Sequence, residues 1–161
     1  MKEQIEIIQK GRSSFIELMH PLSIEQLNHI PEGFSNNIVW NFGHIIAVQQ
    51  GLCYGLGGIP AHMDVELIKK YRKGSKPGTV VELVELIQLS NLSVSLIDTF
   101  VAEMEHNKNV YAVQTPLLTA LGYSIDTFEK AVQFNTFHEG LHYGYAMALK
   151  RAVLKDLPIL K

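Results

Sequence analysis

Apolar residues recur at helical spacing along four long segments of this sequence, and the alternation typical of strands is nearly absent. Amphipathic helices of this length bury their apolar faces by packing against one another. The sequence therefore predicts an all-α fold, a four-helix bundle with longer connections after its second and third helices. We expect these four helices over about Lys2–Met19, from the cap candidates Ser35-Asn36-Asn37 to Leu56, over Thr79–Met104 and over Ser124–Leu154.

Capping patterns predict where two of the helices begin. Ser23-Ile24-Glu25-Gln26 and Thr79-Val80-Val81-Glu82 both have the capping-box pattern, in which side chains bond to free backbone N–H groups. The first predicts a short helical turn, and the second predicts a sharp start of the third long helix. Apolar residues of that helix repeat at heptad spacing, so we expect the stripe to face the core. Its members are Val80, Leu83, Ile87, Ser90, Val94, Ile97, Val101 and Met104.

Two connections are long for a helical bundle. The first, Gly57–Gly78, is expected to hold a short helix at Asp64–Tyr71. The second, His106–Tyr123, is rich in apolar residues, which predicts that it packs over one end of the bundle. Together the two connections are expected to form the mouth of a site. The apolar residues of the second connection are Tyr111, Pro116, Leu117, Leu118 and Leu121.

Composition and charge narrow the class of protein. The 161 residues suit a single domain over residues 1–161. The formal net charge is -2 and no basic arm is present, which argues against nucleic acid as a partner. No apolar run reaches the roughly 18 residues that span a bilayer, so no membrane is expected. The single cysteine, Cys53, rules out an intrachain disulfide, fits the reducing cytoplasm and is expected to be a small buried hydrophobe.

Two histidines in the last helix stand on its predicted core-facing stripe. His138 and His142 are four residues apart, so they lie one turn apart on one helical face. Buried polar groups are costly unless they are paired or coordinated. A polar cluster in the middle of an apolar stripe therefore points to a metal ion bound by both rings. The stripe is Phe128, Ala131, Asn135, His138, His142, Tyr145, Leu149 and Ala152.

A third histidine, His44, lies on the apolar stripe of the second long helix. Gly43 beside it lacks a side chain, which allows close approach of another element or a ligand. Three neutral imidazoles can hold a divalent transition metal and leave a position open, as in catalytic sites. Imidazole suits Zn, Ni, Cu and Fe(II), so the residue types alone do not select the metal. Asn135, one turn before His138, is a candidate partner for a ring N–H.

A second interpretation requires no metal. Each of the three histidines can instead be a core residue whose ring is hydrogen-bonded to a backbone carbonyl or to a neighbour such as Asn135. A HxxxH pair on a helix is more often structural than metal-binding. Only when the inward-facing His44 is added do the residues favour the metal site and the structural role equally.

In the segments around His44 and around His138 and His142, the sequence resembles the DinB superfamily, the DinB/YfiT-like group of metalloenzymes. One matching segment is Asn37-Ile38-Val39-Trp40-Asn41-Phe42-Gly43-His44-Ile45, which is similar to the family's Trp and Gly-His segment in the second helix. The other is His138-Glu139-Gly140-Leu141-His142-Tyr143-Gly144, which is similar to its HxxxHxGQ segment. The resemblance implies that His44, His138 and His142 are the metal ligands, with Zn or Ni as the expected metal. The family often has Gln where this chain has Tyr145.

The resemblance also implies an activity, though several functions stay open. Family members of known activity are similar to thiol-dependent transferases or isomerases, which use low-molecular-weight thiols such as bacillithiol or mycothiol. We therefore expect a metal-dependent thiol S-transferase acting on small electrophiles. The alternatives are a metal-dependent hydrolase, a non-catalytic metal-binding bundle with a structural or sensor role, and a purely structural domain.

Two further expectations concern the surroundings of the site. No general base is evident, and Tyr145, expected on the core stripe, is the candidate catalytic hydrogen-bond donor. The family resemblance implies a homodimer. Gly140 and Gly144, four residues apart on the last helix, predict close helix packing either within the chain or across such a dimer.

Overall fold

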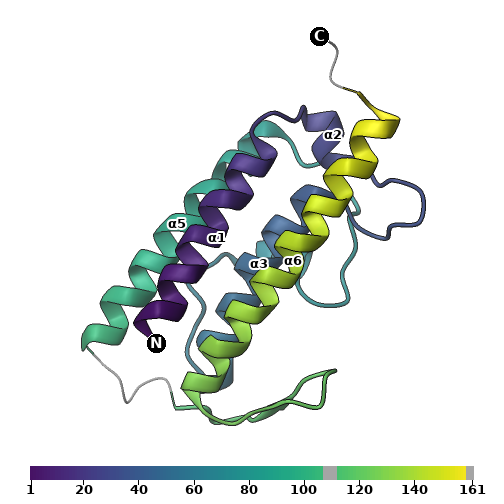
Figure 1. Ribbon diagram of the computed structural model, residues 1–161. Coiled ribbons are helices and arrows are strands. Elements are labelled where there is room, and N and C mark those ends of the chain that lie inside the picture. The colour runs from purple at the N-terminus through teal and green to yellow at the C-terminus, as the bar shows by residue number, and fades with distance from the viewer. Residues whose placement is uncertain (107–111, 159–161) are drawn as a thin grey trace.

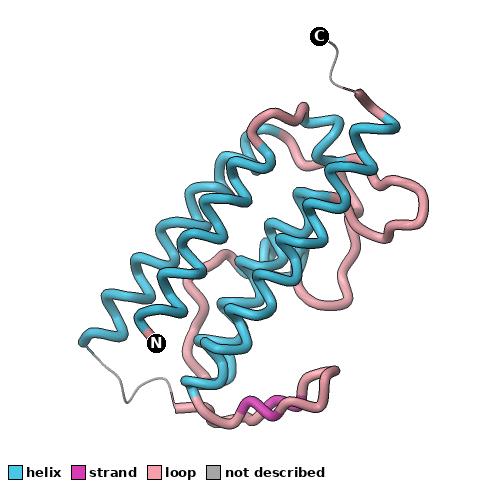
Figure 2. The backbone as a smooth tube through the Cα atoms, viewed as in Figure 1, coloured by secondary structure: helices cyan, strands magenta, loops and turns pink. Residues whose placement is uncertain are grey.

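The computed structural model describes residues 1–106 and 112–158, and Figure 2 shows that helices dominate it. Four long helices lie side by side (Figure 1), with contacts between α3 and α6, α1 and α6, α1 and α5, and α3 and α5. The all-α prediction is therefore confirmed. In chain order the elements are α1 (Lys2–Met19), α2 (Ile24–Asn28), α3 (Ile38–Cys53), the 3-10 helix η1 (Gly55–Gly57), α4 (Val65–Tyr71), α5 (Leu83–His106), β1 (Leu117–Leu118), β2 (Ser124–Ile125) and α6 (Phe128–Asp156).

Capping side chains start α2 and α3, at Ser23 as the capping-box pattern predicted and at Asn37, one of the three cap candidates in the sequence. Ser23 and Gln26 form the complete capping box of α2. The Asn37 side chain accepts a hydrogen bond from the Trp40 N–H at the start of α3. Both caps satisfy backbone donors that have no partner within the helix. The Asn37 cap sets where α3 begins and so places the helix that carries His44.

The helix α5 starts later than its capping-box pattern predicted. It begins at Leu83, so the expected start at Thr79 is wrong. The N–H of the buried Val81 donates to Asn28 Oδ1 at 2.8 Å, and Asn28 Nδ2 donates to the Val81 carbonyl at 3.0 Å. These two bonds hold the segment against α2, and the bond to the Val81 carbonyl occupies an acceptor that a helix starting at Thr79 would use itself.

The connection before α6 contains a small hairpin that the sequence did not predict. β1 pairs antiparallel with β2, and α6 therefore begins at Phe128 rather than at Ser124. Ile125 is buried, but Leu118 and Leu121 are 71% and 70% exposed. The expectation that these leucines pack over the end of the bundle is wrong. Tyr111, which belonged to the same expectation, lies outside the described residues.

The first half of the predicted heptad stripe faces solvent, opposite to the prediction, whereas its second half packs on the core as expected. α5 is apolar nearly all round, so its sequence offers two candidate faces and only packing selects one. By length and composition α5 could also cross a membrane over Leu83–Met104, and a single such helix is weak evidence of a span. The exposed members are Val80, Leu83, Ile87 and Val94, whereas Ile97 is buried and Val101 and Met104 pack against the core. Outside the stripe, the core receives Leu89, Leu96 and Phe100.

The helix α3 occupies the centre of the molecule, between α6 and α5, and α4 also packs on it. Nearly every side chain of α3 is buried, so this helix is surrounded rather than amphipathic. Apolar partners from α1 and α6 include Phe15 and Leu149. The polar groups of α3, among them Asn41 and His44, therefore lie inside the protein and need partners there.

A buried ion pair joins α1 to α6. Both guanidinium Nε and Nη2 of Arg12 donate to the carboxylate of Glu139, at 3.1 and 2.8 Å, and Nη1 donates to the Ser93 carbonyl on α5. The two side chains are 1% and 6% exposed. Because the pair joins three helices, it constrains how α6 is rotated toward α3. The sequence patterns did not indicate it, since Glu139 falls off the apolar stripe of α6.

Two smaller predictions have clear outcomes. Gly140 and Gly144 are exposed, and a Cβ atom at either position would meet no atom within 4 Å, so they do not mediate close packing within the described chain.

Cys53 is buried, as expected, and burial raises the pKa of its thiol to about 12. Cys53 is therefore a packing residue and not a nucleophile.

Candidate metal centre

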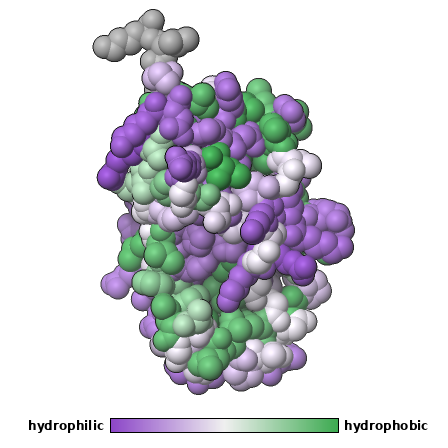
Figure 3. All heavy atoms as spheres, turned by 90° about the vertical axis from the view of Figure 1, so that its right-hand side faces the viewer, coloured by the Kyte–Doolittle hydropathy of each residue, from purple (hydrophilic) through white to green (hydrophobic). Residues whose placement is uncertain are grey.

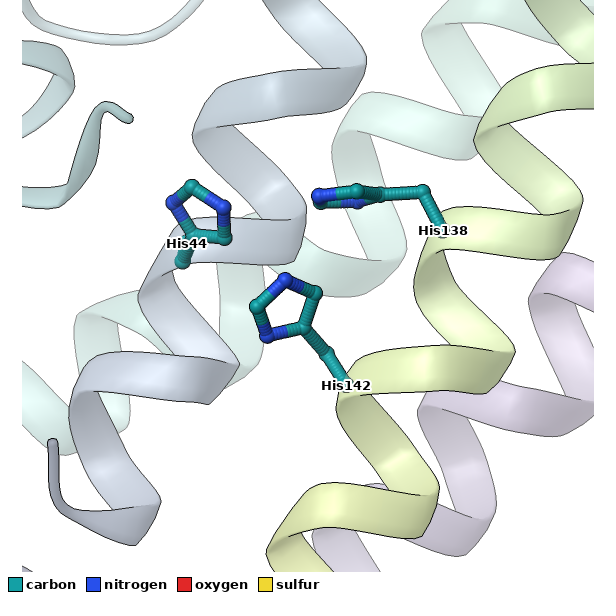
Figure 4. A group of neighbouring side chains, drawn as sticks. All are labelled: His44, His138 and His142. Carbon is teal, nitrogen blue, oxygen red and sulfur yellow. The ribbon is translucent and has the colours of Figure 1, made fainter. Parts of the chain in front are cut away.

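Three histidines from two helices converge between α3 and α6. His44 comes from α3, and His138 and His142 come from successive turns of α6 (Figure 4). One ring nitrogen from each residue lies within 4.8 Å of the others. The sequence predicted this trio, and the structure brings all three together. Because α3 and α6 share the most extensive helix contact of the molecule, the trio rests on a rigid pair of elements.

A close approach of Tyr71 to Gly43 fixes the surroundings of His44. A Cβ atom at Gly43 would lie 2.5 Å from Tyr71 Cδ1, so only glycine admits the ring there. This contact brings the Tyr71 carbonyl to 2.6 Å from His44 Nδ1. The prediction that Gly43 permits a close approach is confirmed, and the approaching group is an aromatic side chain of α4.

The hydrogen bond to Tyr71 determines which nitrogen of His44 is free. A carbonyl oxygen only accepts, so Nδ1 carries the proton and Nε2 keeps its lone pair. The indole of Trp40 stacks on the imidazole with ring centroids 4.6 Å apart and an interplanar angle of 13°. His44 is thus held in tautomer and in orientation before any ligand arrives.

The Asn41 side chain fixes the tautomer of His142 in the same way as the Tyr71 carbonyl fixes that of His44. Its Nδ2 donates to the Asn37 carbonyl at 2.7 Å, which turns Oδ1 toward His142 Nδ1 at 2.7 Å. The amide oxygen accepts, so His142 Nδ1 is protonated and Nε2 is free. Sequence reasoning missed Asn41. Its position in α3, three residues before His44, is the signal that could have indicated a polar residue on the same side of the helix.

His138 differs from the other two ligands. Its Nδ1 is buried and has no hydrogen-bond partner among the described residues. The predicted partner, Asn135, instead donates from Nδ2 to Glu139 Oε1 at 2.9 Å, and its own buried Oδ1 also has no partner in the described structure. Burying such atoms without a partner costs free energy, and His138 therefore lacks the supporting hydrogen bond that fixes the rings of His44 and His142.

The three rings are neutral at neutral pH. Burial, followed by the charges of His142 and His44, lowers the pKa of His138 to about 3. Burial and the charge of His44 lower the pKa of His142 to about 4. The pKa of His44 is also lowered by burial, against the opposing effect of its bond to Tyr71. Since a metal binds only the unprotonated ring, the three nitrogens are available as ligands without deprotonation.

Tyr145 is not a core residue, contrary to the prediction. It is 37% exposed and packs edge-on against Phe34 at 5.5 Å between ring centroids. Toward the start of α6, the ring centroids of Phe134 and His138 are 6.2 Å apart. Phe134 also stacks with Tyr123 of the hairpin. Aromatic residues therefore flank the three histidines along α6.

A helical protein with an open donor set of three neutral imidazoles belongs to the class of proteins that can hold a divalent metal ion. The chain belongs to the DinB superfamily, whose family model matches residues 7–146. The match includes His44, His138 and His142, and it agrees with the resemblance in the two histidine segments. No curated protein matches the chain.

Proposed function

We propose that the chain is a metal-dependent enzyme in which a four-helix bundle holds Zn or Ni between α3 and α6. The observation that carries this proposal is the convergence of three neutral histidine rings, two of which present Nε2 because their Nδ1 atoms are bonded to Tyr71 and Asn41. Three ligands leave a coordination position for a further molecule, which is the arrangement of catalytic sites.

The reaction that we propose is transfer of a low-molecular-weight thiol to a small electrophile. A bound divalent metal would supply Lewis acidity, which lowers the pKa of a thiol toward neutrality. The thiol proton leaves to solvent, the sulfur forms a bond to the electrophilic carbon, and the leaving group departs with the electron pair of the broken bond.

In this reaction the protein positions the metal ligands, and no residue is assigned to accept the thiol proton. The hydrogen bonds that His44 and His142 donate to Tyr71 and Asn41 fix two rings, and the contact between α3 and α6 sets their spacing from His138. Such supporting bonds around metal ligands typically raise metal affinity about 10–100-fold. Tyr145, at the exposed edge of α6, is the proposed hydrogen-bond donor to a substrate or leaving group.

Elemental analysis of untagged protein tests metal binding. We expect close to one equivalent of Zn or Ni per chain, a higher melting temperature when either metal is added, and loss of both effects in His138→Ala. Metal-free protein that gains no thermal stability from Zn or Ni would contradict the metal centre and favour core histidines with a structural role.

Activity assays separate the enzyme from its alternatives. Metal-loaded protein is incubated with a panel of thiols and alkylating electrophiles, and consumption of free thiol is followed. We expect turnover that is lost in His142→Ala. Hydrolysis of the panel without thiol consumption would favour a metal-dependent hydrolase. Metal binding without either reaction would favour a structural or sensor role for the ion.

A cytoplasmic homodimer is the proposed biological form. The single buried Cys53 suits a reducing compartment. Gly140 and Gly144 leave open space on the surface of α6, where a second copy can approach closely. Light scattering of the wild type and of Gly144→Leu tests this arrangement. A monomeric wild type, or a dimer that Gly144→Leu leaves intact, would count against it.

A further inference from the structure

A cationic turn follows α4, next to the metal centre. Arg72, Lys73 and Lys76 lie within five residues, and all three side chains are exposed. None of them takes part in an ion pair within the described part of the chain, whereas the preceding Lys69 and Lys70 are paired with acids. In a protein with a net charge of -2, three unpaired cations in one turn form a local positive surface.

Contacts through Tyr71 and Trp40 connect this turn to His44. It begins directly after Tyr71, whose carbonyl holds His44. Trp40, which stacks on His44, donates its indole N–H to Ser75 Oγ at 3.2 Å. The Ser75 hydroxyl in turn lies 2.7 Å from the Lys70 carbonyl and 2.9 Å from the Arg72 carbonyl. The cationic turn and His44 are therefore parts of one hydrogen-bonded unit.

The backbone of the turn has a defined shape. Gly74 has a φ of 87°, a conformation that other residues rarely adopt, and the Ser75 N–H donates to the Arg72 carbonyl at 3.1 Å. A turn fixed in this way holds the backbone of its cationic residues at a constant position relative to His44. This distinguishes the turn from lysines on a helix surface, such as Lys69, which is paired with Glu66 within the same helix.

We propose that Arg72, Lys73 and Lys76 bind a carboxylate or phosphate group of the substrate whose reactive atom lies at the three histidines. This inference rests on the proposed function and names the chemical class of its substrate as anionic. Guanidinium and ammonium groups are the usual partners of carboxylates and phosphates. Figure 3 shows one face of the molecule, on which hydrophilic residues spread across the middle and hydrophobic residues gather toward the lower end.

The single tryptophan offers a direct measurement of anion binding. Trp40 contacts both Ser75 and His44, so its fluorescence responds to an anion on the turn. The full-length protein as purified is titrated with succinate and with inorganic phosphate, against sodium chloride at equal ionic strength. We expect a saturable change with at least one of the two anions, and the comparison shows whether carboxylate or phosphate is preferred.

A matched pair of triple variants tests the assignment. Arg72→Gln/Lys73→Gln/Lys76→Gln removes the cations of the turn, and Lys2→Gln/Lys10→Gln/Lys155→Gln removes the same charge from exposed sites on α1 and α6. We expect at least tenfold weaker anion binding in the turn variant and unchanged binding in the control variant. No saturable response beyond that of chloride, or an equal loss in both variants, overturns the proposal.

A second titration connects the turn to the substrate. Cobalt-loaded protein is titrated with mercaptosuccinate, a thiol with two carboxylates, and with neutral 2-mercaptoethanol, and the thiolate-to-metal absorption is followed. We expect mercaptosuccinate to bind at least tenfold more tightly, with the difference lost in the turn variant and kept in the control variant. Equal affinities for the two thiols overturn the anionic-substrate inference but leave the thiol function intact. If neither thiol binds the metal, the thiol function fails, and the fluorescence titration alone decides whether the turn binds anions.

Discussion

The three histidines are not equivalent, and the difference lies in their hydrogen bonds. His44 and His142 each have Nδ1 bonded to a fixed acceptor, so their rings are set before a metal binds. His138 has a buried Nδ1 without a partner in the described structure. We infer that His44 and His142 form the preorganised pair, and that His138 completes the site. The supporting residues therefore matter as much as the ligands themselves.

Replacement of Asn41 tests this difference. In Asn41→Ala the ring of His142 loses the acceptor that fixes its tautomer, so we expect metal affinity to fall about 10–100-fold. Isothermal titration with Zn measures the change. Asn135→Ala is the matched control, because Asn135 is equally buried but donates to Glu139 and not to a histidine. An equal loss of affinity in both variants would show that Asn135 also supports the site.

At the scale of the helices, α3 and α4 can pack this closely only because Gly43 has no side chain. The Tyr71 ring occupies the space that a Cβ atom of Gly43 would fill. We expect Gly43→Ala to destabilise the protein by about 1–3 kcal/mol, as overpacking usually does. Gly51→Ala is the control on the same helix, because a Cβ atom there meets no atom within 4 Å. Since alanine favours a helix over glycine, Gly51→Ala should add roughly 0.5–1 kcal/mol. Urea unfolding of both variants gives the two values, and equal effects would refute the close-approach argument.

The ion pair between α1 and α6 should be costly to break on one side. Arg12→Met leaves the buried carboxylate of Glu139 without its cation, so we expect a loss of about 3–5 kcal/mol of stability. The double variant Arg12→Met/Glu139→Met removes both charges and should recover a large part of that loss. Chemical denaturation of the wild type, the single variant and the double variant measures the loss and its recovery. A double variant as unstable as Arg12→Met alone would mean that packing, and not the unpaired charge, causes the effect.

For the molecule as a whole, the neutral histidines predict how stability depends on pH. The pKa of His138 falls from 6.5 to about 3 on folding, and that of His142 falls to about 4. Below pH 6.5 the unfolded chain takes up protons that the folded chain does not, so acid favours unfolding. We expect stability of the metal-free protein to be constant above pH 7 and to decline between pH 6.5 and 4, by on the order of 2–3 kcal/mol for each ring. Thermal unfolding in a chelator measures this decline. It should be shallower in His138→Gln, and an unchanged slope would contradict the pKa assignment.

The helical class and the pairing of His138 with His142 could be predicted because they depend on local spacing. The four-residue interval of His138 and His142 places both rings on one face whatever the rest of the chain does. Gly43 beside His44 marked a close approach for the same local reason. Interactions between distant segments could not be predicted. Glu139 is 127 residues from Arg12 in the chain, and nothing in its neighbourhood indicated that it would be buried.

Periodicity determined that this chain is helical and that three histidines face inward, because 3.6 residues per turn dictate which residues share a face. Which apolar face of α5 enters the core depended on packing against α1 and α3, since the helix has two such faces. The hydrogen bonds that orient His44 and His142 likewise depend on the tertiary structure. The Tyr71 carbonyl and the Asn41 amide became partners of His44 and His142 only when α4, α3 and α6 packed together.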